Sequence, residues 1–195
     1  GSIFGFLVAR QAYDSALLAP LFIALSLSYG LAVFLLALMA ASQGGARPLG
    51  DALLARLARL QVIFIAAGLY FVLVYHLTNL YFTRHHGFER FLLVDGGIHT
   101  ALFWLGQVGL GGLLPLALLL HPDIGRIRRR IVLCAALVTG GGLAQMYVTI
   151  IGGQAFPLVL FPGRQTSSSF RDGVVNPYLP SLPEWLLGLG GVALA

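Results

Sequence analysis

Long apolar runs alternate with short polar segments along this chain. Four runs lie at about residues 16–41, 60–82, 92–120 and 131–160, and a fifth begins near residue 183. Each of the first four exceeds the about 20 residues that a helix needs to cross a bilayer core. Backbone groups in lipid must pair within their own segment, so these runs are expected to be helices. Short connections make consecutive helices neighbours, which predicts an all-α membrane protein: an antiparallel transmembrane four-helix bundle plus the start of a fifth helix.

The two ends of the sequence indicate a piece of a larger subunit. The first residue is Gly1 rather than methionine, and the fifth apolar run covers only residues 183–195. At about 1.5 Å per residue, that run is too short for a hydrocarbon core of about 30 Å. We therefore expect residues 1–195 to form one transmembrane domain that is incomplete at both ends.

Composition supports a membrane protein and argues against other classes. Apolar residues make up 58% of the 195 residues, charged residues make up 10%, and the mean hydropathy is +0.88. The 12 basic residues are all arginines in short clusters between apolar runs, so the formal charge of +5 does not indicate nucleic-acid binding. Cys134 is the single cysteine, which excludes an intramolecular disulfide and a cysteine-ligated metal site in these residues.

The charges between the runs predict the orientation of the helices. Segments 42–59 and 121–130 together carry a net charge of +5, whereas segments 2–15, 83–95 and 162–183 together carry +1. The positive-inside rule places the first set in the cytoplasm and the second set on the outer side. We therefore expect a multi-pass protein of the bacterial inner membrane.

Polar side chains within the runs gather near that outer side. An ionisable group at membrane depth is costly, so it is a candidate functional residue. His76 and Asn79 are three residues apart, and Asp95 and His99 are four apart, so each pair shares one face of a helix. The helical rise places the two histidines at a similar depth, which predicts that they meet.

These residue types point to quinol chemistry. Quinol oxidation needs a hydrogen-bond partner on each ring oxygen and a base for the protons, and a histidine beside a carboxylate provides such a base near neutral pH. We therefore expect catalytic roles for Asp95, His99 and His76. The expected quinone-binding residues are His76, Asn79, His99, Gln154 and Tyr75. Helix capping by Asp95 and hydrogen bonds between helices are the structural alternatives.

Other polar positions leave further interpretations open. Gln107 and Gln145 are either steps of a proton path or packing residues that bond across helices. His76 and His99 could instead ligate a b-type haem, a use that would not require Asp95. His85 and His86 have no evident further ligands, so we expect no metal site there but a solvated loop.

Several segments resemble the NrfD/polysulfide-reductase family of membrane subunits. The segments are residues 15–22 running into 26–32, residues 103–104 followed by 109–115, residues 150–154, and residues 178–184 before the last apolar run. Their order and spacing are similar to the C-terminal half of such a subunit.

The resemblance implies a haem-free subunit of two four-helix bundles that exchanges electrons between a quinone pool (menaquinone or ubiquinone) and a docked ferredoxin-like Fe–S subunit. A molybdopterin catalytic subunit or a multihaem cytochrome completes such complexes, and the Fe–S clusters belong to the partner. The family's best-described quinone site lies in the N-terminal bundle, so the quinone residues above are an interpretation of this sequence. We expect Arg164 and Arg171 to contact the Fe–S partner. A non-catalytic scaffold and a proton-translocating module using Asp95, His99, Gln107 and Gln145 are the alternatives.

Overall fold

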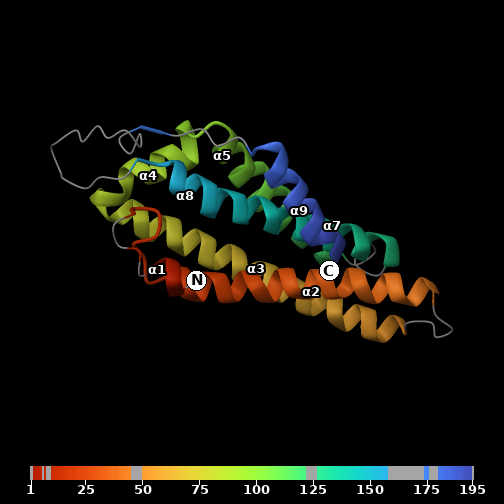
Figure 1. Cartoon of the computed structure of the whole chain (residues 1–195). Coiled ribbons are helices and arrows are strands. Elements are labelled where there is room, and N and C mark those ends of the chain that lie inside the picture. Colours follow the sequence, from red (N-terminus) through yellow and green to blue (C-terminus); the bar gives the residue numbers. More distant parts are fainter. Residues whose placement is uncertain are drawn as a thin grey trace.

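Four long helices form the body of the computed structural model (Figure 1). The structure describes residues 2–5, 7, 10–44, 50–121, 127–157, 174–175 and 180–194. Four helices in these residues are long and apolar enough to cross a membrane: Leu18–Ser42, Asp51–Tyr81, Ile98–Leu120 and Arg128–Ala155. The predicted all-α membrane fold is confirmed.

The long helices are assembled from the following elements. The first is α2 (Leu18–Gly44) and the second is α3 (Asp51–Tyr81). The third joins α5 (Ile98–Ala101), the π-helix η3 (Leu102–Leu113) and α6 (Leu114–Leu120). The fourth joins α7 (Arg128–Tyr147), the π-helix η4 (Val148–Gly152) and α8 (Gly153–Ala155). The short elements are α1 (Ser2–Gly5), η1 (Thr83–His85), α4 (His86–Arg90), η2 (Phe91–Asp95) and α9 (Leu182–Leu194).

Helix α3 begins at Asp51, well before the apolar run expected from residue 60. Arg56 and Arg59 limit the apolar run at its N-terminal side, but the helix extends beyond them. A helix can continue outside the apolar region, because its polar side chains are there solvated by water. Asp51 lies in the first turn, where its negative charge interacts favourably with the positive end of the helix dipole. Its carboxylate also lies 2.6 Å from the Arg128 guanidinium at the start of α7. The charged ends of two neighbouring spans are thereby joined.

The third span begins later than the sequence suggested. We expected a helix from about residue 92, but the backbone breaks at Gly96 and Gly97, and Gly97 has a φ of 57°. Only glycine adopts this conformation readily. The residues before the break form the short segment η1–α4–η2, which packs back on the end of α3 and on α5. Asp95 and His99 therefore do not lie on one continuous helix.

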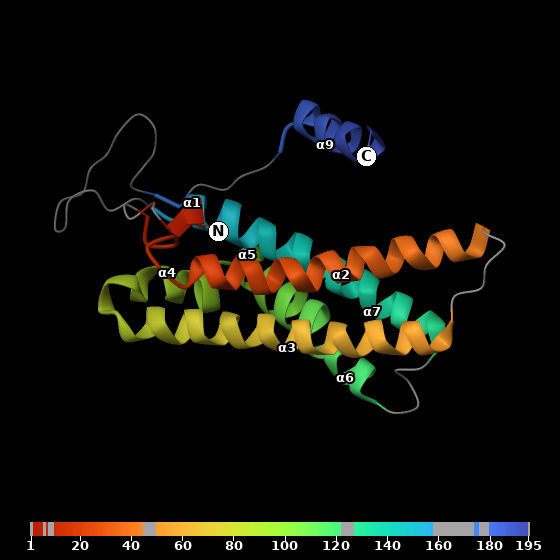
Figure 2. The same ribbon diagram turned by 90° about the horizontal axis from the view of Figure 1, so that it is seen from below.

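The helices pack closely through glycines. Helix α7 packs against η3 and α2, and α2 packs against α3 (Figure 2). At the crossing of η3 and α7, a Cβ built on Gly111 would collide with the backbone of Gly141, and the reverse is also true. This close approach of two backbones is typical of small residues at helix interfaces in membranes.

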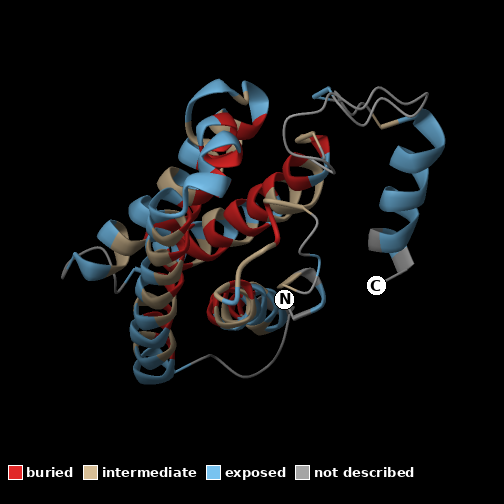
Figure 3. Ribbon diagram, turned by 90° about the vertical axis from the view of Figure 1, so that its left-hand side faces the viewer, coloured by how far each residue is buried: buried red, intermediate tan, exposed pale blue. Residues whose placement is uncertain are grey.

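Buried residues form two clusters along the bundle, and Figure 3 shows burial confined to the faces where helices meet. One cluster is aromatic and includes Tyr13, Tyr75, Phe88 and Phe103. The other is aliphatic and lies toward the opposite end of the helices. Many large apolar side chains remain exposed, as expected where the surface faces lipid rather than water. The described side chains of α9 are also exposed.

Candidate functional site

The centre of the site is a carboxylate buried among polar groups. Glu89 of α4 is 0% exposed. His76 Nδ1 lies 2.7 Å from Glu89 Oε2, and the side-chain amide of Asn79 donates to Glu89 Oε1 at 2.7 Å. A buried charge is stable only when it is paired and hydrogen-bonded. The fold therefore brings His76 and Asn79 together, as their spacing predicted, but around a carboxylate from the following segment.

This contact also sets the chemistry of the imidazole. A carboxylate at Nδ1 favours the tautomer that carries its proton there. The Nε2 atom of His76 then presents a lone pair to whatever lies on the other side of the ring. The rings of Tyr75 and Phe103 hold the imidazole edge-on, at centroid distances of 5.0 and 4.8 Å. The imidazole of His76 is thus held in one orientation.

His76 borders an apolar groove between α3 and η3. The groove has a volume of about 220 Å³, and its walls are mainly leucine, valine and aromatic side chains. Leu73, Leu77 and Trp104 line it and are about half exposed, so the groove opens on the lipid-facing surface. The Trp104 indole N–H donates to the Leu93 carbonyl at 3.0 Å. Among the side chains that line the groove, the Trp104 N–H is already engaged, so Nε2 of His76 is the polar atom that could bind a ligand.

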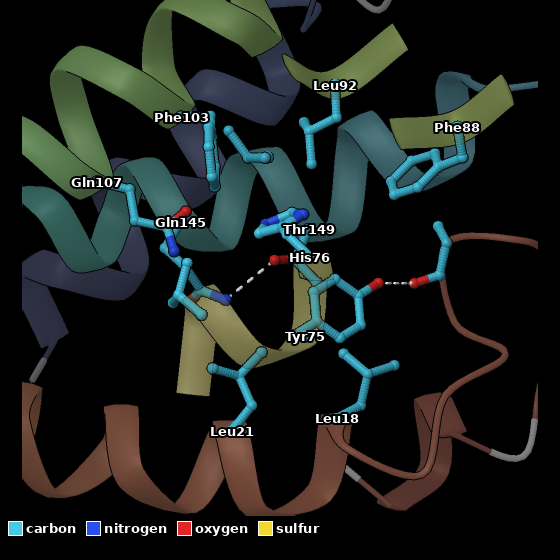
Figure 4. Close-up of a pocket in the computed structure, with 13 residues that line it drawn as sticks. Leu18, Leu21, Tyr75, His76, Phe88, Leu92, Phe103, Gln107, Gln145 and Thr149 are labelled. Atoms are coloured by element: carbon cyan, nitrogen blue, oxygen red, sulfur yellow. Dashed lines mark hydrogen bonds between the residues drawn. The ribbon is translucent and has the colours of Figure 1, made fainter. Parts of the chain in front are cut away.

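His76 also lines a small cavity on the inner side, where several polar side chains stand among apolar ones (Figure 4). This inner cavity measures about 30 Å³ and is lined by Tyr75, Gln107, Gln145 and Thr149 among others. Gln145 donates to the Thr149 hydroxyl at 2.9 Å, while its Oε1 atom is buried without a partner. A space of this size with several polar groups accommodates a water molecule. Both glutamines expected on a proton path thus lie beside His76.

The segment before α2 closes the site at the end of the bundle that carries α4. Tyr75 donates to the carbonyl of Ala12 at 2.7 Å. Tyr13 donates to the carbonyl of Thr149 at 2.9 Å, which ties this segment to η4. Burial raises the pKa of Tyr13 above its ordinary value of 10.0, so the hydroxyl keeps the proton that this bond requires. Arg10 donates to the Gln154 carbonyl at 3.0 Å.

The structure does not bring Asp95 and His99 into this site. Asp95 is about half exposed and pairs with Arg90 at 2.9 Å. His99 is buried, stacks on Tyr147 at 5.6 Å, and has no partner on Nδ1. It lines neither of the two spaces that His76 lines. The expected Asp95–His99 dyad is not formed, and separate surroundings for the two histidines do not fit haem ligation by both.

The other residues predicted to bind quinone or a partner subunit are Gln154, Arg164 and Arg171. Gln154 is exposed, and its backbone rather than its side chain is engaged by Arg10. Arg164 and Arg171 lie outside the described residues. Within the residues that the structure describes, no three His, Cys, Asp or Glu side chains gather as a metal site.

Two candidate functional residues were not predicted from the sequence. Glu89 and His85 stand in a segment that the sequence marked as a polar loop, yet both are buried. His85 was expected in solvent, but η1 and α4 fold its side chain inward, where Nε2 lies 3.7 Å from Asp14. Their four-residue spacing, which puts two ionisable groups on one helix face, is the signal that could have found them.

The fold places this chain among multi-pass α-helical membrane proteins. More narrowly, the chain belongs to the polysulphide reductase NrfD family, whose pattern matches residues 1–158. The chain is 31% identical to the Hdr-like menaquinol oxidoreductase integral membrane subunit of Archaeoglobus fulgidus, covering 100% of this chain and 49% of that protein. It is 28% identical to a selenate reductase subunit of Mesobacillus selenatarsenatis, covering 100% of this chain and 44% of that protein.

The chain therefore spans about half the length of these curated relatives. No solved structure matches it.

Proposed function

We propose that this chain is a quinol-binding membrane subunit of a multisubunit respiratory oxidoreductase. The observation that carries the proposal is a single base, His76, backed by the buried Glu89 and placed at an apolar groove that opens to lipid. A quinol needs this combination, since its tail requires apolar surface and its hydroxyl requires a base. The naming of one relative as a menaquinol oxidoreductase subunit agrees with this function.

The geometry supports a defined set of steps. The quinol ring enters the groove from the bilayer and donates a hydroxyl proton to His76 Nε2. The proton on Nδ1 passes to Glu89, which is held in place by Asn79. The imidazole, now protonated on Nε2, turns about its Cβ–Cγ bond so that its free Nδ1 accepts the second hydroxyl proton, while two electrons leave for the Fe–S clusters of a docked ferredoxin-like subunit. The quinone returns to the bilayer.

The proposed complex lies in the bacterial inner membrane with the His76 end on the outer side. The Fe–S subunit docks at that end, where Arg164 and Arg171 would meet its acidic groups. A molybdopterin subunit or a multihaem cytochrome completes the electron path. The naming of relatives as selenate reductase and menaquinol oxidoreductase subunits supports membership of such a complex.

The test is quinol turnover by the intact complex carrying His76→Ala or Glu89→Gln. Each change removes the positioned base or the acceptor of its proton, so we expect kcat with a short-chain quinol to fall by about 10²- to 10⁴-fold. Reduction of the partner Fe–S centres, followed by electron paramagnetic resonance, reports the same step directly.

His121→Ala is the matched control, because His121 is exposed and stands at the other end of the bundle, after α6. This variant should turn over normally. Wild-type turnover in His76→Ala, with the complex assembled, would overturn the proposal and favour a scaffold that holds quinone elsewhere.

A second function, proton translocation through the bundle, is favoured by the inner cavity. Gln107 lines both this cavity and a second space of about 20 Å³ that reaches Ser28. Gln61 donates to the Ser28 carbonyl at 3.0 Å and has an unpartnered Oε1 atom. Retained quinol turnover with lost proton pumping in Gln107→Leu would support this function.

A further inference from the structure

We propose that His85 and Asp14 form a proton exit that connects the buried Glu89 with the outer surface. The inference rests on the proposed function, because Glu89 must first receive protons from a quinol through His76. It assigns a role to two residues that do not line the groove or the inner cavity.

The helix geometry brings the exit next to Glu89. Helix α4 begins at His86 directly after the turn η1, so His85 and Glu89 lie one helical turn apart on the same face. Both side chains are buried, which means that this face points into the bundle. The neighbouring Phe88 belongs to the aromatic core cluster and anchors the segment there.

The ionisable groups then become more exposed step by step. Glu89 is 0% exposed, and the side chain of His85 is 7% exposed. His85 Nε2 lies 3.7 Å from the carboxylate of Asp14, which is 27% exposed. The same carboxylate lies 3.7 Å from Arg84, whose side chain is 66% exposed. A proton that leaves Glu89 by this route passes through His85 to Asp14, whose carboxylate is partly exposed to water.

Two buried polar atoms beside this route have no protein partner. They are Nδ1 of His85 and Oε1 of Gln11. Gln11 reaches over the start of α4, where its Oε1 would lie 3.8 Å from a Cβ on Gly87. Buried polar atoms are almost always hydrogen-bonded, and ordered water supplies the partner where protein does not. A water between Glu89 and His85 Nδ1 would bridge one helical turn.

The number of protons released per quinol defines how many protons the exit must transfer in each turnover. Each quinol that is oxidised gives two protons and two electrons, and the electrons leave for the Fe–S clusters of the partner subunit. Neutral His76 and the carboxylate of Glu89 together accept two protons, so one turnover fills the site. A second turnover therefore requires both protons to leave: Glu89 passes its own proton, and then the one it takes from His76, to His85, and His85 passes each to Asp14.

The experiment uses the intact complex with His85→Ala and the milder His85→Gln. In both variants the first quinol should reduce the Fe–S centres at the wild-type rate, while kcat falls by about 10- to 100-fold. Added imidazole should restore kcat in His85→Ala, because it replaces the missing proton carrier, and should do nothing for the wild type. Asp14→Asn should show the same burst with no imidazole rescue.

The results separate this inference from the proposed function. If His76→Ala lowers kcat but both His85 variants turn over normally, the exit is wrong and the quinol site stands. If Gln145→Leu instead produces the burst followed by slow turnover, protons leave through the inner cavity and the exit is overturned. Loss of the burst itself in His85→Gln would show a structural role and would also refute the relay.

Discussion

At the scale of residues, the site is built around a carboxylate that is buried away from water and held by hydrogen bonds. Glu89 has no exposed surface, and its two oxygens each meet one donor, from His76 and Asn79. A hydrogen bond to a charged group contributes more than one between neutral groups, and its loss leaves a desolvated charge. Asn79 therefore positions the carboxylate of Glu89.

This role predicts a stability effect for Asn79→Ala. The change leaves Glu89 Oε1 without a donor, so we expect the free energy of unfolding to fall by about 1–3 kcal/mol. The measurement is thermal unfolding of the purified complex or subunit in detergent. In a Glu89→Gln background the same change should cost clearly less, since no charge remains; equal costs in both backgrounds would contradict a role for the charge.

The sequence predicted part of this residue-scale picture. His76 and Asn79 share a helix face within an apolar run, and that pattern alone marks them as candidates. The carboxylate was assigned to Asp95 because it stands four residues before His99. Glu89 takes this place instead because Gly96 and Gly97 break the helix and turn the preceding segment onto α3. The spacing of residues along one helix does not reveal that a neighbouring segment folds back onto it.

At the scale of elements, close helix packing is what holds the polar groups in place. η3 carries Phe103 and Gln107 into the site, and α7 carries Gln145. These two helices approach closely where Gly111 faces Gly141. Because lipid offers no hydrophobic drive for helices to associate, such tight contact supplies much of the attraction. The π-helical form of η3 agrees with a functional segment, since π-bulges are frequent at functional sites.

Neighbouring glycines of α7 provide a matched prediction. A Cβ on Gly141 would collide with the Gly111 backbone, which cannot give way as a side chain can. We expect Gly141→Ala to lower the free energy of unfolding by about 1–3 kcal/mol. Gly140→Ala is the control, because a Cβ there meets nothing within 4 Å. That variant should be neutral or slightly stabilising, by up to about 1 kcal/mol, as for alanine replacing glycine in a helix. Thermal unfolding measures both, and equal effects would contradict this packing.

The helical spans were easier to predict than their ends. Apolar length identifies a membrane helix, because few polar side chains are tolerated in lipid. Where a helix ends depends on individual residues, which the length of an apolar run does not reveal. Asp51 starts α3 outside the apolar run, and Gly97 delays the third span. The sequence predicts a polar loop for residues 83–90, but η1 and α4 fold them into helical turns that bury Glu89.

At the scale of the whole molecule, the two ends of the bundle differ in chemistry. The end with α4 holds the buried polar site and the aromatic cluster, whereas the other end holds an aliphatic cluster. Among the described residues, Arg56 and Arg59 in the first turns of α3 and Arg128, Arg129 and Arg130 at the start of α7 stand toward that second end. Basic side chains and the buried polar site therefore lie at opposite ends of the bundle, and the positive-inside rule predicts that the site faces the outer side.

Cysteine labelling tests this sidedness. Cys134 is the single native cysteine, and it is buried in α7, so background labelling should be low. Thr83→Cys places a thiol at the exposed start of η1, and Gly50→Cys places one at the exposed start of α3. We expect a membrane-impermeant maleimide to label the first variant in intact spheroplasts and the second only after the membrane is opened. The reverse pattern would place the quinol site on the cytoplasmic side, and the protons leaving through His85 would then enter the cytoplasm instead of crossing to the outside.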